Sequence, residues 1–383
     1  MYKNIDANLS RCTGCMACSF ACKSNAITFV LNNDGFYKPV VDHERCVNCG
    51  ACLKHCPSKL ISQTEIKSTF YGWSKDNNVR NNSSSGGAFF EIASNFILNN
   101  GVVYGASLIE YNKVEHIRIC NIKELYRTQG SKYIQSNLID CYKNISKDIK
   151  EGNKILFSGT PCQVAAVKAL FPNYKNLFTI DLVCFGFISN GMYNLYMEGL
   201  QQKYKSKIKS VIFRDQKHNN KLNTTLENGK EIFCDYRDNP KTGLYSRFIN
   251  KAMCKDACID CNFRSKNRFG DITLSDYPYS SSDELDSERR GVSVIYISTN
   301  RGYELCKNIN FEITPSHNLI DSFLSNKHNN NFLKNAKIFR NQYHKFANRP
   351  KLFLRIFENN VSKRSFRDRF ISKIRNIKNI KIK

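Results

Sequence analysis

The chain has 383 residues, of which 41% are hydrophobic, and it carries a formal net charge of +25. This length allows two or three domains. We expect no membrane-spanning helix, because no run of about 18 apolar residues occurs, and no secretory signal, because the first residues lack an apolar segment. In such a chain, 17 cysteines favour metal ligation in the reducing cytoplasm over disulfides.

Two runs of four cysteines open the chain, RCTGCMACSFACK at residues 11–23 and ERCVNCGACLKHCPSK at residues 44–59. Each reads C-x2-C-x2-C-x3-C, a spacing in which three thiolates bind one [4Fe–4S] cluster and the fourth binds a second cluster. The spacing therefore predicts two clusters. The predicted ligands of the first cluster are Cys12, Cys15, Cys18 and Cys56. Those of the second cluster are Cys46, Cys49, Cys52 and Cys22.

Structural zinc or disulfides are the alternative interpretations of these cysteines. Structural zinc uses four thiolates per ion in paired C-x2-C hooks, which repeated three-cysteine runs match poorly. Lys23 follows Cys22 where the cluster pattern usually has proline, whereas Pro57 keeps the proline of the second run. We therefore prefer the two-cluster interpretation.

We expect four parts along the chain. Residues 1–62 form the two-cluster domain, with a short hairpin in AITFVLNNDGFYKPVVD. Residues 63–82 are polar and read as a linker. A larger domain follows at 83–312, and a basic helical extension at 313–383.

The larger domain alternates between predicted helices and strands. A helix is expected at 88–98 and a strand in VVYGASLI after it. The next unit is a strand at 155–157 and a helix that begins at Pro161. Further on we expect a strand in NLFTIDLVCFG, a helix at 190–204, strands within 208–236, and a strand followed by a helix at 291–309. This order predicts a mixed α/β (α+β) fold.

Two stretches of the larger domain precede predicted helices in a way that suits anions. SSSGG before residue 88 and SGTPCQ around Pro161 offer hydroxyl and backbone N–H groups at the positive end of a helix dipole. Such turns are also ordinary helix caps. Neither a GxGxxG nor a GxxxxGK[ST] motif occurs, so the usual dinucleotide fingerprint and the P-loop are both missing.

Four later cysteines are enough for a third cluster. They are Cys162 at a predicted helix start, Cys184 after a predicted strand, and the pair Cys258 and Cys261. Cys254 is a fifth candidate ligand. The spacing of CKDACIDC also occurs in radical S-adenosylmethionine enzymes, but too few residues follow it here to build their barrel.

The last 33 residues are strongly basic, with only Glu358 and Asp368 as acids. Apolar residues recur there at near-helical spacing, namely Phe353, Ile356, Phe366, Phe370 and Ile374. A terminal helix packed on the core explains this pattern best. A basic amphipathic helix that makes weak contact with a membrane surface or binds an acidic partner is the alternative.

Several stretches resemble the coenzyme F420 hydrogenase/dehydrogenase beta-subunit family, in the form with a fused N-terminal ferredoxin domain. In chain order they are SSSGGAFFEIA, GVVYGASL, TQGSKYIQS, ILFSGTPCQVAAVKALF, FTIDLVCFG, CIDCNFRSKNRFGDITLSDY and GVSVIYISTNRG. The resemblance covers about residues 1–300 and implies a flavin-dependent oxidoreductase.

The resemblance also implies cofactor ligands. A third [4Fe–4S] cluster would use Cys162, Cys184, Cys258 and Cys261, and FAD would lie along three loops. Lys132 is the candidate for contact with the flavin phosphate or ring, and so for a catalytic role. The implied flavin-binding residues are Ser83, Ser84, Ser85, Gly86, Gly87, Gly130, Ser131, Lys132, Tyr133, Gln135, Ser136, Ser158, Gly159 and Thr160.

Three departures from the family pattern concern the substrate pocket. Phe185 replaces the histidine of VCHG and so removes a possible proton donor. Residues 275–279 replace GDFWG, and no GW follows the Phe-Arg-Asp stretch at 213–215. The substrate is therefore not implied to be coenzyme F420 itself.

We expect single electrons from an acidic, ferredoxin- or flavodoxin-like carrier to pass through the clusters to FAD, and from there to a small organic acceptor. A non-catalytic electron-transfer subunit that serves a partner enzyme is the alternative. The basic charge could steer acidic partners, although no nucleic-acid recognition motif occurs.

Overall fold

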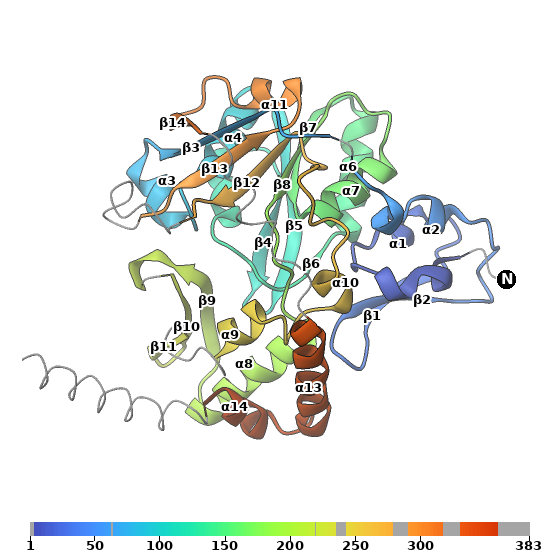
Figure 1. Ribbon diagram of the computed structural model, residues 1–383, viewed down its shortest axis with the longest axis vertical. Helices are drawn as coiled ribbons and strands as arrows, with labels where there is room; N and C mark the ends of the chain where they lie inside the picture. The colour runs from blue at the N-terminus through green and yellow to red at the C-terminus, as the bar shows by residue number, and fades with distance from the viewer. Residues whose placement is uncertain are drawn as a thin grey trace, which may run out of the picture.

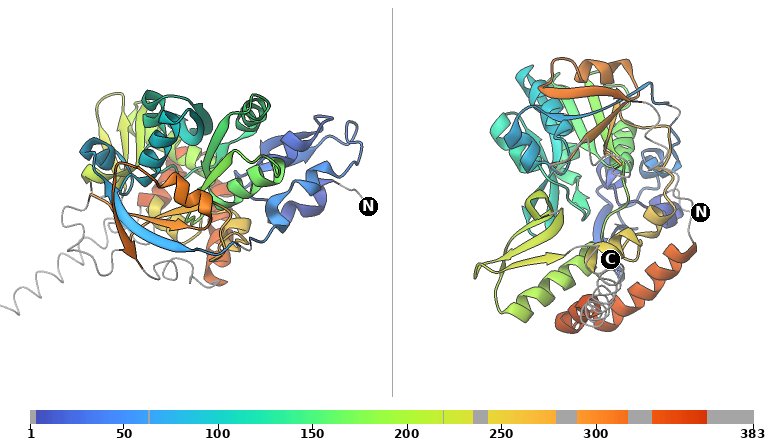
Figure 2. Two further views of the ribbon diagram at one scale, coloured as in Figure 1. Left: turned by 90° about the horizontal axis from the view of Figure 1, so that it is seen from above. Right: turned by 60° about the vertical axis from the view of Figure 1, so that its left-hand side comes forward.

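The computed structural model describes residues 4–62, 64–218, 220–234, 243–278, 290–316 and 330–358. A large sheet with helices on both faces forms the centre of the molecule, and the N-terminal domain lies to one side of it (Figures 1 and 2). A smaller sheet and a group of helices lie below the large sheet in Figure 1. The mixed α/β fold class predicted from the sequence is confirmed.

The N-terminal domain holds the cysteine runs on short helices around a two-stranded hairpin. Strands β1 and β2 pair antiparallel from Ile27↔Val41 to Leu31↔Tyr37, as the sequence predicts. Cys18 lies in α1 and Cys52 in α2, and these helices pack against each other. The elements are η1 (Ile5–Arg11), α1 (Ala17–Ala21), β1 (Ile27–Leu31), β2 (Tyr37–Val41), α2 (Ala51–Lys54) and η2 (Pro57–Lys59).

The large sheet has nine strands in the order β14-β3-β13-β12-β8-β7-β4-β5-β6. Its central strands β4, β7, β8 and β12 run parallel. Strands β13 and β3 pair antiparallel to both of their neighbours, and β5 pairs antiparallel to β4 and parallel to β6. The strands are β3 (Ser68–Ser74), β4 (Gly101–Glu110), β5 (Lys113–Ile119), β6 (Ser136–Asn137), β7 (Lys154–Gly159), β8 (Leu177–Leu182), β12 (Ile272–Asp276), β13 (Ser293–Ile297) and β14 (Phe311–Ser316).

Both faces of this sheet are apolar because its central strands are covered on each side. Along β4, Val103 packs with helix α4 residues such as Phe96, whereas Val102 and Tyr104 pack with α6 and α7. This alternation follows from the two-residue period of a strand. The surrounding helices are α3 (Asn77–Asn82), α4 (Ala88–Leu98), α5 (Ile122–Leu125), η3 (Tyr126–Thr128), α6 (Ile139–Lys150), α7 (Pro161–Leu170) and α11 (Asn300–Leu305).

A second apolar core joins the lower helices to a three-stranded antiparallel sheet. Helix α8 is central to it, and α14 packs along α8. Phe353 of α14 is fully buried there. The elements are α8 (Asn190–Tyr204), β9 (Ile208–Asp215), η4 (Gln216–His218), β10 (Lys221–Leu226), β11 (Glu231–Cys234), α9 (Leu244–Ile249), α10 (Asp256–Ile259), α13 (Asn330–Phe346) and α14 (Pro350–Glu358).

The predicted linker at 63–82 is wrong. Residues 68–74 form β3, which pairs with β13 on one side and β14 on the other. Residues 77–82 form α3, capped by the Asp76 side chain. The larger domain therefore begins before residue 83, and β14 carries it past the predicted end at 312. The strand was missed because both of its partner strands lie more than 200 residues away in the chain.

The C-terminal extension supplies two described helices, α13 and α14, and the predicted positions Phe366, Phe370 and Ile374 lie outside the described residues. The described half of the pattern packs on the core, through Phe353, Leu354 and Phe357. Within the described ranges, no helix has the length and apolarity needed to cross a membrane.

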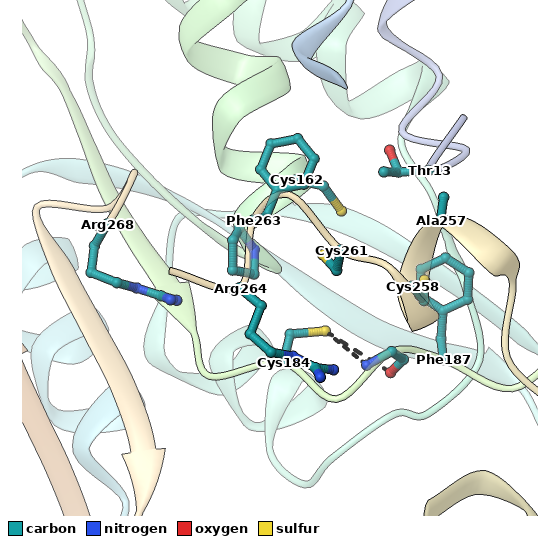
Figure 3. Close-up of a pocket in the computed structure, with 12 residues that line it drawn as sticks. Thr13, Cys162, Cys184, Phe187, Ala257, Cys258, Cys261, Phe263, Arg264 and Arg268 are labelled. Carbon is teal, nitrogen blue, oxygen red and sulfur yellow. Dashed lines mark hydrogen bonds between the residues drawn. The ribbon is translucent and has the colours of Figure 1, made fainter. Parts of the chain in front are cut away.

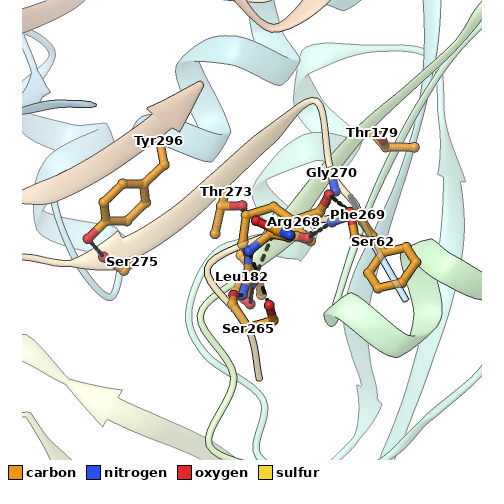
Figure 4. Close-up of polar contacts among 12 residues, drawn as sticks. Ser62, Thr179, Leu182, Ser265, Arg268, Phe269, Gly270, Thr273, Ser275 and Tyr296 are labelled. Carbon is orange, nitrogen blue, oxygen red and sulfur yellow. Dashed lines mark hydrogen bonds and ion pairs between the residues drawn. The ribbon is translucent and has the colours of Figure 1, made fainter. Parts of the chain in front are cut away.

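A buried ion pair fixes the loop that precedes β12 (Figure 4). Arg268 Nη2 lies 3.0 Å from Asp181 Oδ1, and both side chains are almost completely buried. Arg268 also donates to the hydroxyl of Thr273 and to the Leu182 carbonyl. The other Asp181 oxygen accepts the backbone N–H of Gly270 at 2.9 Å. The pair therefore joins the end of β8 to the whole 265–273 segment.

We predict that Asp181→Asn lowers the free energy of unfolding by about 3–5 kcal/mol, because it leaves the Arg268 charge buried without its partner. Denaturant unfolding followed by circular dichroism measures this change. Asp140→Asn is the control, since Asp140 pairs with Lys143 on the surface and its loss costs at most about 1 kcal/mol. Equal unfolding midpoints for the two variants would contradict the prediction.

A buried histidine joins three strands of the large sheet. The His116 ring on β5 lies 2.7 Å from the Ser136 hydroxyl on β6 and 2.9 Å from the Ser158 carbonyl on β7. Burial lowers the pKa of His116 to about 4, below its ordinary value of 6.5. As the pH falls from 6.5 towards 4, the His116 ring is therefore protonated in the unfolded chain but stays neutral in the folded protein.

The stabilising contribution of neutral His116 is thus present above pH 6.5 and is lost as the pH falls towards 4. We predict that wild type loses about 1 kcal/mol more stability than His116→Gln between pH 7.5 and pH 5.5. Denaturant titrations of both proteins at the two pH values test this. Parallel losses in the two proteins would show that His116 does not carry the effect.

Candidate functional site

Four cysteines of the N-terminal domain lie together although they come from both sequence runs. This first cysteine group consists of Cys12, Cys15, Cys18 and Cys56. Burial raises the pKa of the Cys15 thiol to about 12, and charges on Cys12 and Cys56 raise it further. The pKa of Cys18 is raised by burial and by the same neighbours. The Asn8 side chain donates to Cys56 Sγ at 3.3 Å. Hydrogen bonds of this kind to sulfur tune the potential of an iron–sulfur centre.

The second cysteine group is the predicted set of Cys46, Cys49, Cys52 and Cys22, and its fourth member likewise comes from the other sequence run. Burial raises the pKa of Cys52, and a charge on Cys22 from the first run adds to it. Cys22 Sγ accepts the N–H of Ala26 at 3.4 Å, and Cys46 Sγ accepts from Asn4 at 3.7 Å. Cys49 is exposed. The structure thus brings Cys56 to the first run and Cys22 to the second, and the assignment of ligands stays a prediction.

The four later cysteines line one pocket (Figure 3). Cys162, Cys184, Cys258 and Cys261 come from three segments and surround a common space, which Phe187, Phe263 and Thr13 help to enclose. The empty volume is about 450 Å³, part of it open to solvent. Within the described ranges, no three Cys, His, Asp or Glu side chains converge on a position for one metal ion.

The sheet topology explains why these cysteines meet. Strands β7 and β8 are parallel neighbours, so Cys162 and Cys184, which follow them, lie at the same edge of the sheet. In α/β sheets, this carboxyl edge is where ligands bind. Cys258 ends the turn of α10, and the Arg268–Asp181 pair holds the loop after Cys261 against β8.

Buried cationic side chains surround the same pocket. Lys251 and Lys255 are only 3% and 4% exposed. Burial lowers the pKa of both amines, and charges on Cys258 and other thiols act against that shift. The Lys251 ammonium donates to the Phe185 carbonyl, and Lys255 to the Tyr37 carbonyl at 2.8 Å. These cations suit a group that carries negative charge.

The donor set fits a [4Fe–4S] centre on two observations. Four thiols face the pocket, and Gly186 N–H donates to Cys184 Sγ at 3.3 Å. The Arg264 Nη2 atom, which belongs to a pocket-lining residue, is buried without a hydrogen-bond partner. Cys254, the fifth candidate, is fully buried, and its pKa is raised to about 11, first by burial. It does not line the pocket.

The first cysteine group lies next to this pocket. Burial raises the pKa of Cys162, and Cys15 is among the neighbouring thiols whose charge raises it further. Thr13, from the first cysteine run, lines the pocket. The Tyr142 hydroxyl of α6 donates to the Cys15 carbonyl at 2.6 Å and so joins the two domains at this point. No sulfur of the second group has this contact with the pocket among the interactions described.

The three predicted flavin loops are linked to one another. The Ser131 N–H and hydroxyl donate to Ser84 Oγ at 2.6 and 2.9 Å, and His116 joins Ser136 to Ser158. Gly130 has a φ of +78°, and a side chain there would meet only open space. That backbone is therefore open to a ligand.

Several residues predicted to contact the flavin instead contact other residues of the protein. The Lys132 ammonium donates to the carbonyls of Thr128 and Gln129 at 2.7 and 2.9 Å, and burial lowers its pKa to about 7. Gln135 donates to the Gly14 carbonyl of the first cysteine run. The Tyr133 ring packs on Phe213, Tyr245 and Phe248.

The remaining members of the predicted set serve as caps and close backbone contacts. Ser83 and Ser85 donate to backbone carbonyls of Val79 and Val292. Thr160 caps α7 together with Gln163. Side chains at Gly86, Gly87 or Gly159 would meet neighbouring atoms at 3.2 Å or less.

Sequence reasoning missed the residues that hold the pocket in place. Asp181, Arg268, Lys251 and Lys255 carry no local motif. Their roles follow from contacts between distant segments, such as the 3.0 Å pair of Arg268 with Asp181. The only local signal was that charged residues lie beside cysteines in DLVCFG and CKDACIDC.

Two family models match the chain. Residues 11–60 match the 4Fe-4S dicluster domain. Residues 152–314 match the C terminus of the coenzyme F420 hydrogenase/dehydrogenase beta subunit. The second match contains all four pocket cysteines.

Two known proteins are similar to parts of the chain. The ferredoxin-type protein NapF of Haemophilus influenzae is 38% identical over 53 residues, which are 14% of this chain and 30% of that protein. A chain of the F420-reducing [NiFe] hydrogenase complex from Methanosarcina barkeri superposes with a TM-score of 0.46 at 17% identity, over 75% of this chain and 95% of that one. From the two family matches, the chain is an iron–sulfur protein that joins a 4Fe-4S dicluster domain to a C-terminal domain of the coenzyme F420 hydrogenase/dehydrogenase beta-subunit family.

Proposed function

We propose that the chain is an iron–sulfur flavoprotein oxidoreductase. Single electrons enter from a small acidic carrier of the ferredoxin or flavodoxin type and pass through the two N-terminal clusters. A third [4Fe–4S] cluster, held by Cys162, Cys184, Cys258 and Cys261, relays them to FAD. The final acceptor is a small organic molecule.

The observation that carries this proposal is that the first cysteine run adjoins the pocket, because Thr13 lines it and the charge of Cys15 acts on the Cys162 thiol. A relay needs its centres close together, and here the first cysteine group adjoins the pocket lined by four further cysteines. The buried cations Lys251 and Lys255 support an anionic occupant of that pocket. The protein would thereby position the clusters and tune their potentials through burial and N–H···S hydrogen bonds.

FAD enters the proposal because clusters move one electron at a time, whereas most organic reductions need two. A bound flavin would supply this conversion. Ser84, Ser131 and the open backbone at Gly130 are the groups that would hold it. Gln135, which joins the 130–136 loop to Gly14, would keep that loop beside the first cysteine group.

A non-catalytic electron-transfer subunit is the second candidate. It is favoured by the internal hydrogen bonds of Lys132, which leave its ammonium occupied by the Thr128 and Gln129 carbonyls. Phe185 in place of a histidine favours it as well, because a proton donor is lost at that position. Acceptor reduction by the purified chain alone distinguishes the two candidates.

We predict about twelve irons and twelve sulfides per chain after anaerobic purification, and about eight of each in the double variant Cys184→Ser/Cys258→Ser. Chemical iron and sulfide assays measure both. Cys141→Ala is the control, because Cys141 is as deeply buried as Cys258 but lies in α6 outside the pocket. About eight irons in wild type would reject the third cluster.

We also predict about one FAD per chain, which is released by heat and identified by its chromatographic mobility. Lys132→Met should lower the flavin content several-fold, because it removes the two hydrogen bonds that shape the 128–132 turn. Lys123→Met, on the neighbouring helix α5, should leave the content unchanged. Wild-type protein with a full set of iron but without flavin would favour the electron-transfer subunit.

A further inference from the structure

Helix α13 of the C-terminal extension contacts the turn of the β1–β2 hairpin, more than 290 residues away in the chain (Figure 1). The His344 ring nitrogen lies 2.9 Å from the Asp34 carboxylate. Arg340, one turn earlier on the helix, lies 3.9 Å from the same carboxylate and stacks over the Phe36 ring at 5.7 Å. One acidic turn of the two-cluster domain thus faces two basic side chains of α13.

The same arginine reaches the cysteine motif of the larger domain. Arg340 Nη2 donates to the Cys254 carbonyl at 3.0 Å and to the Asp256 carboxylate at 2.7 Å. These residues form the start of α10, which carries Cys258 into the pocket. Arg340 therefore contacts the two-cluster domain and the segment that bears two of the pocket cysteines.

The start of α8 also holds the hairpin turn, through hydrogen bonds to its backbone carbonyls. The Ser189 hydroxyl donates to the Asp34 carbonyl at 2.9 Å, and the Gly191 N–H donates to the Gly35 carbonyl at 2.9 Å. Gly35 has a φ of +73°, and a side chain there would come within 2.7 Å of the Gly191 backbone. This close approach seats one side of the turn on α8, and the Asp34 carboxylate faces α13 on the other.

We propose that Arg340 and His344 form a clasp that holds the two-cluster domain against the larger domain and so keeps Cys15 beside Cys162. The clasp consists of these two side chains and their partners Asp34 and Asp256. Arg340 is a positioning residue, because its side chain contacts the hairpin turn and the segment before α10 and none of the twelve assigned cluster ligands. This inference rests on the proposed function only for its effect on electron transfer.

The clasp differs from an ordinary surface ion pair in two ways. The Arg340 side chain is only 14% exposed. It hydrogen-bonds the Asp256 carboxylate and the Cys254 carbonyl of the larger domain and forms a longer ion pair, at 3.9 Å, with Asp34 of the two-cluster domain. Isolated exposed pairs contribute little, whereas partly buried, charge-assisted hydrogen bonds contribute more. Loss of the clasp should therefore loosen the hairpin without unfolding either domain core.

The test uses the full-length protein, purified anaerobically with its clusters. In Arg340→Gln/His344→Gln, hydrogen–deuterium exchange within residues 27–41 should become about tenfold faster, with iron content unchanged. In the fully reduced protein, the magnetic coupling between the proposed third cluster and the N-terminal cluster nearest to it should weaken in the electron paramagnetic resonance spectrum, whereas the coupling within the two-cluster domain should remain. Arg340→Lys should restore part of both signals, because it keeps the charge.

Lys337→Gln is the matched control, since Lys337 is an exposed cation one turn earlier on α13. Asp34→Asn is the second variant, which removes the acidic partner and leaves α13 intact. Unchanged exchange of the hairpin in both the double variant and Asp34→Asn would overturn the clasp. A wild-type protein with about eight irons and no coupling to a third cluster would overturn the third cluster instead, and the exchange rate of the hairpin would then test the clasp by itself.

Discussion

The arrangement of the pocket depends on the buried pair of Arg268 with Asp181. Burying two charges is costly, and hydrogen bonds from the remaining polar atoms must offset that cost. Here Arg268 also reaches Thr273, Ser265 and Leu182, and Asp181 accepts two backbone N–H groups. Because Asp181 ends β8 shortly before Cys184, and Arg268 follows Cys261, the pair sets the distance between two cysteines of the pocket.

Local signals were enough to predict the elements on which the site is built. The helix predicted at 88–98 is α4, and the helix predicted to start at Pro161 is α7. Both have a clear start in the sequence, the SSSGG turn for α4 and Pro161 at the first position of α7. Strand β3 had no such signal, because its stability comes from β13 and β14 at the far end of the chain. Domain limits drawn from local polarity therefore failed there.

In the candidate site, too, residues with a local sequence signal could be predicted and residues that depend on distant contacts could not. Cysteine spacing pointed to the eight ligands of the N-terminal clusters, since three thiolates that serve one such cluster are close in sequence. The four later cysteines came instead from a predicted helix start, a strand end, a C-x2-C pair and the family resemblance. Spacing says nothing of side chains that come from elsewhere in the chain. Arg340, His344 and Lys255 meet the N-terminal domain only after the chain has folded, and their neighbours in the sequence give no hint of it. These contacts are among those that join the two domains.

The two buried lysines connect the fold to the proposed chemistry. Lysine is almost never fully buried unless it is paired. The ammonium groups of Lys251 and Lys255 donate to the neutral carbonyls of Phe185 and Tyr37, which do not balance a charge. The opposite charges that act on them are those of cysteine thiolates, Cys254, Cys184 and Cys258 for Lys251, and Cys12, Cys258 and Cys162 for Lys255. Lys255 therefore lies close to thiols of both the first cysteine group and the pocket, and ionisation of those thiols would offset the burial that lowers its pKa.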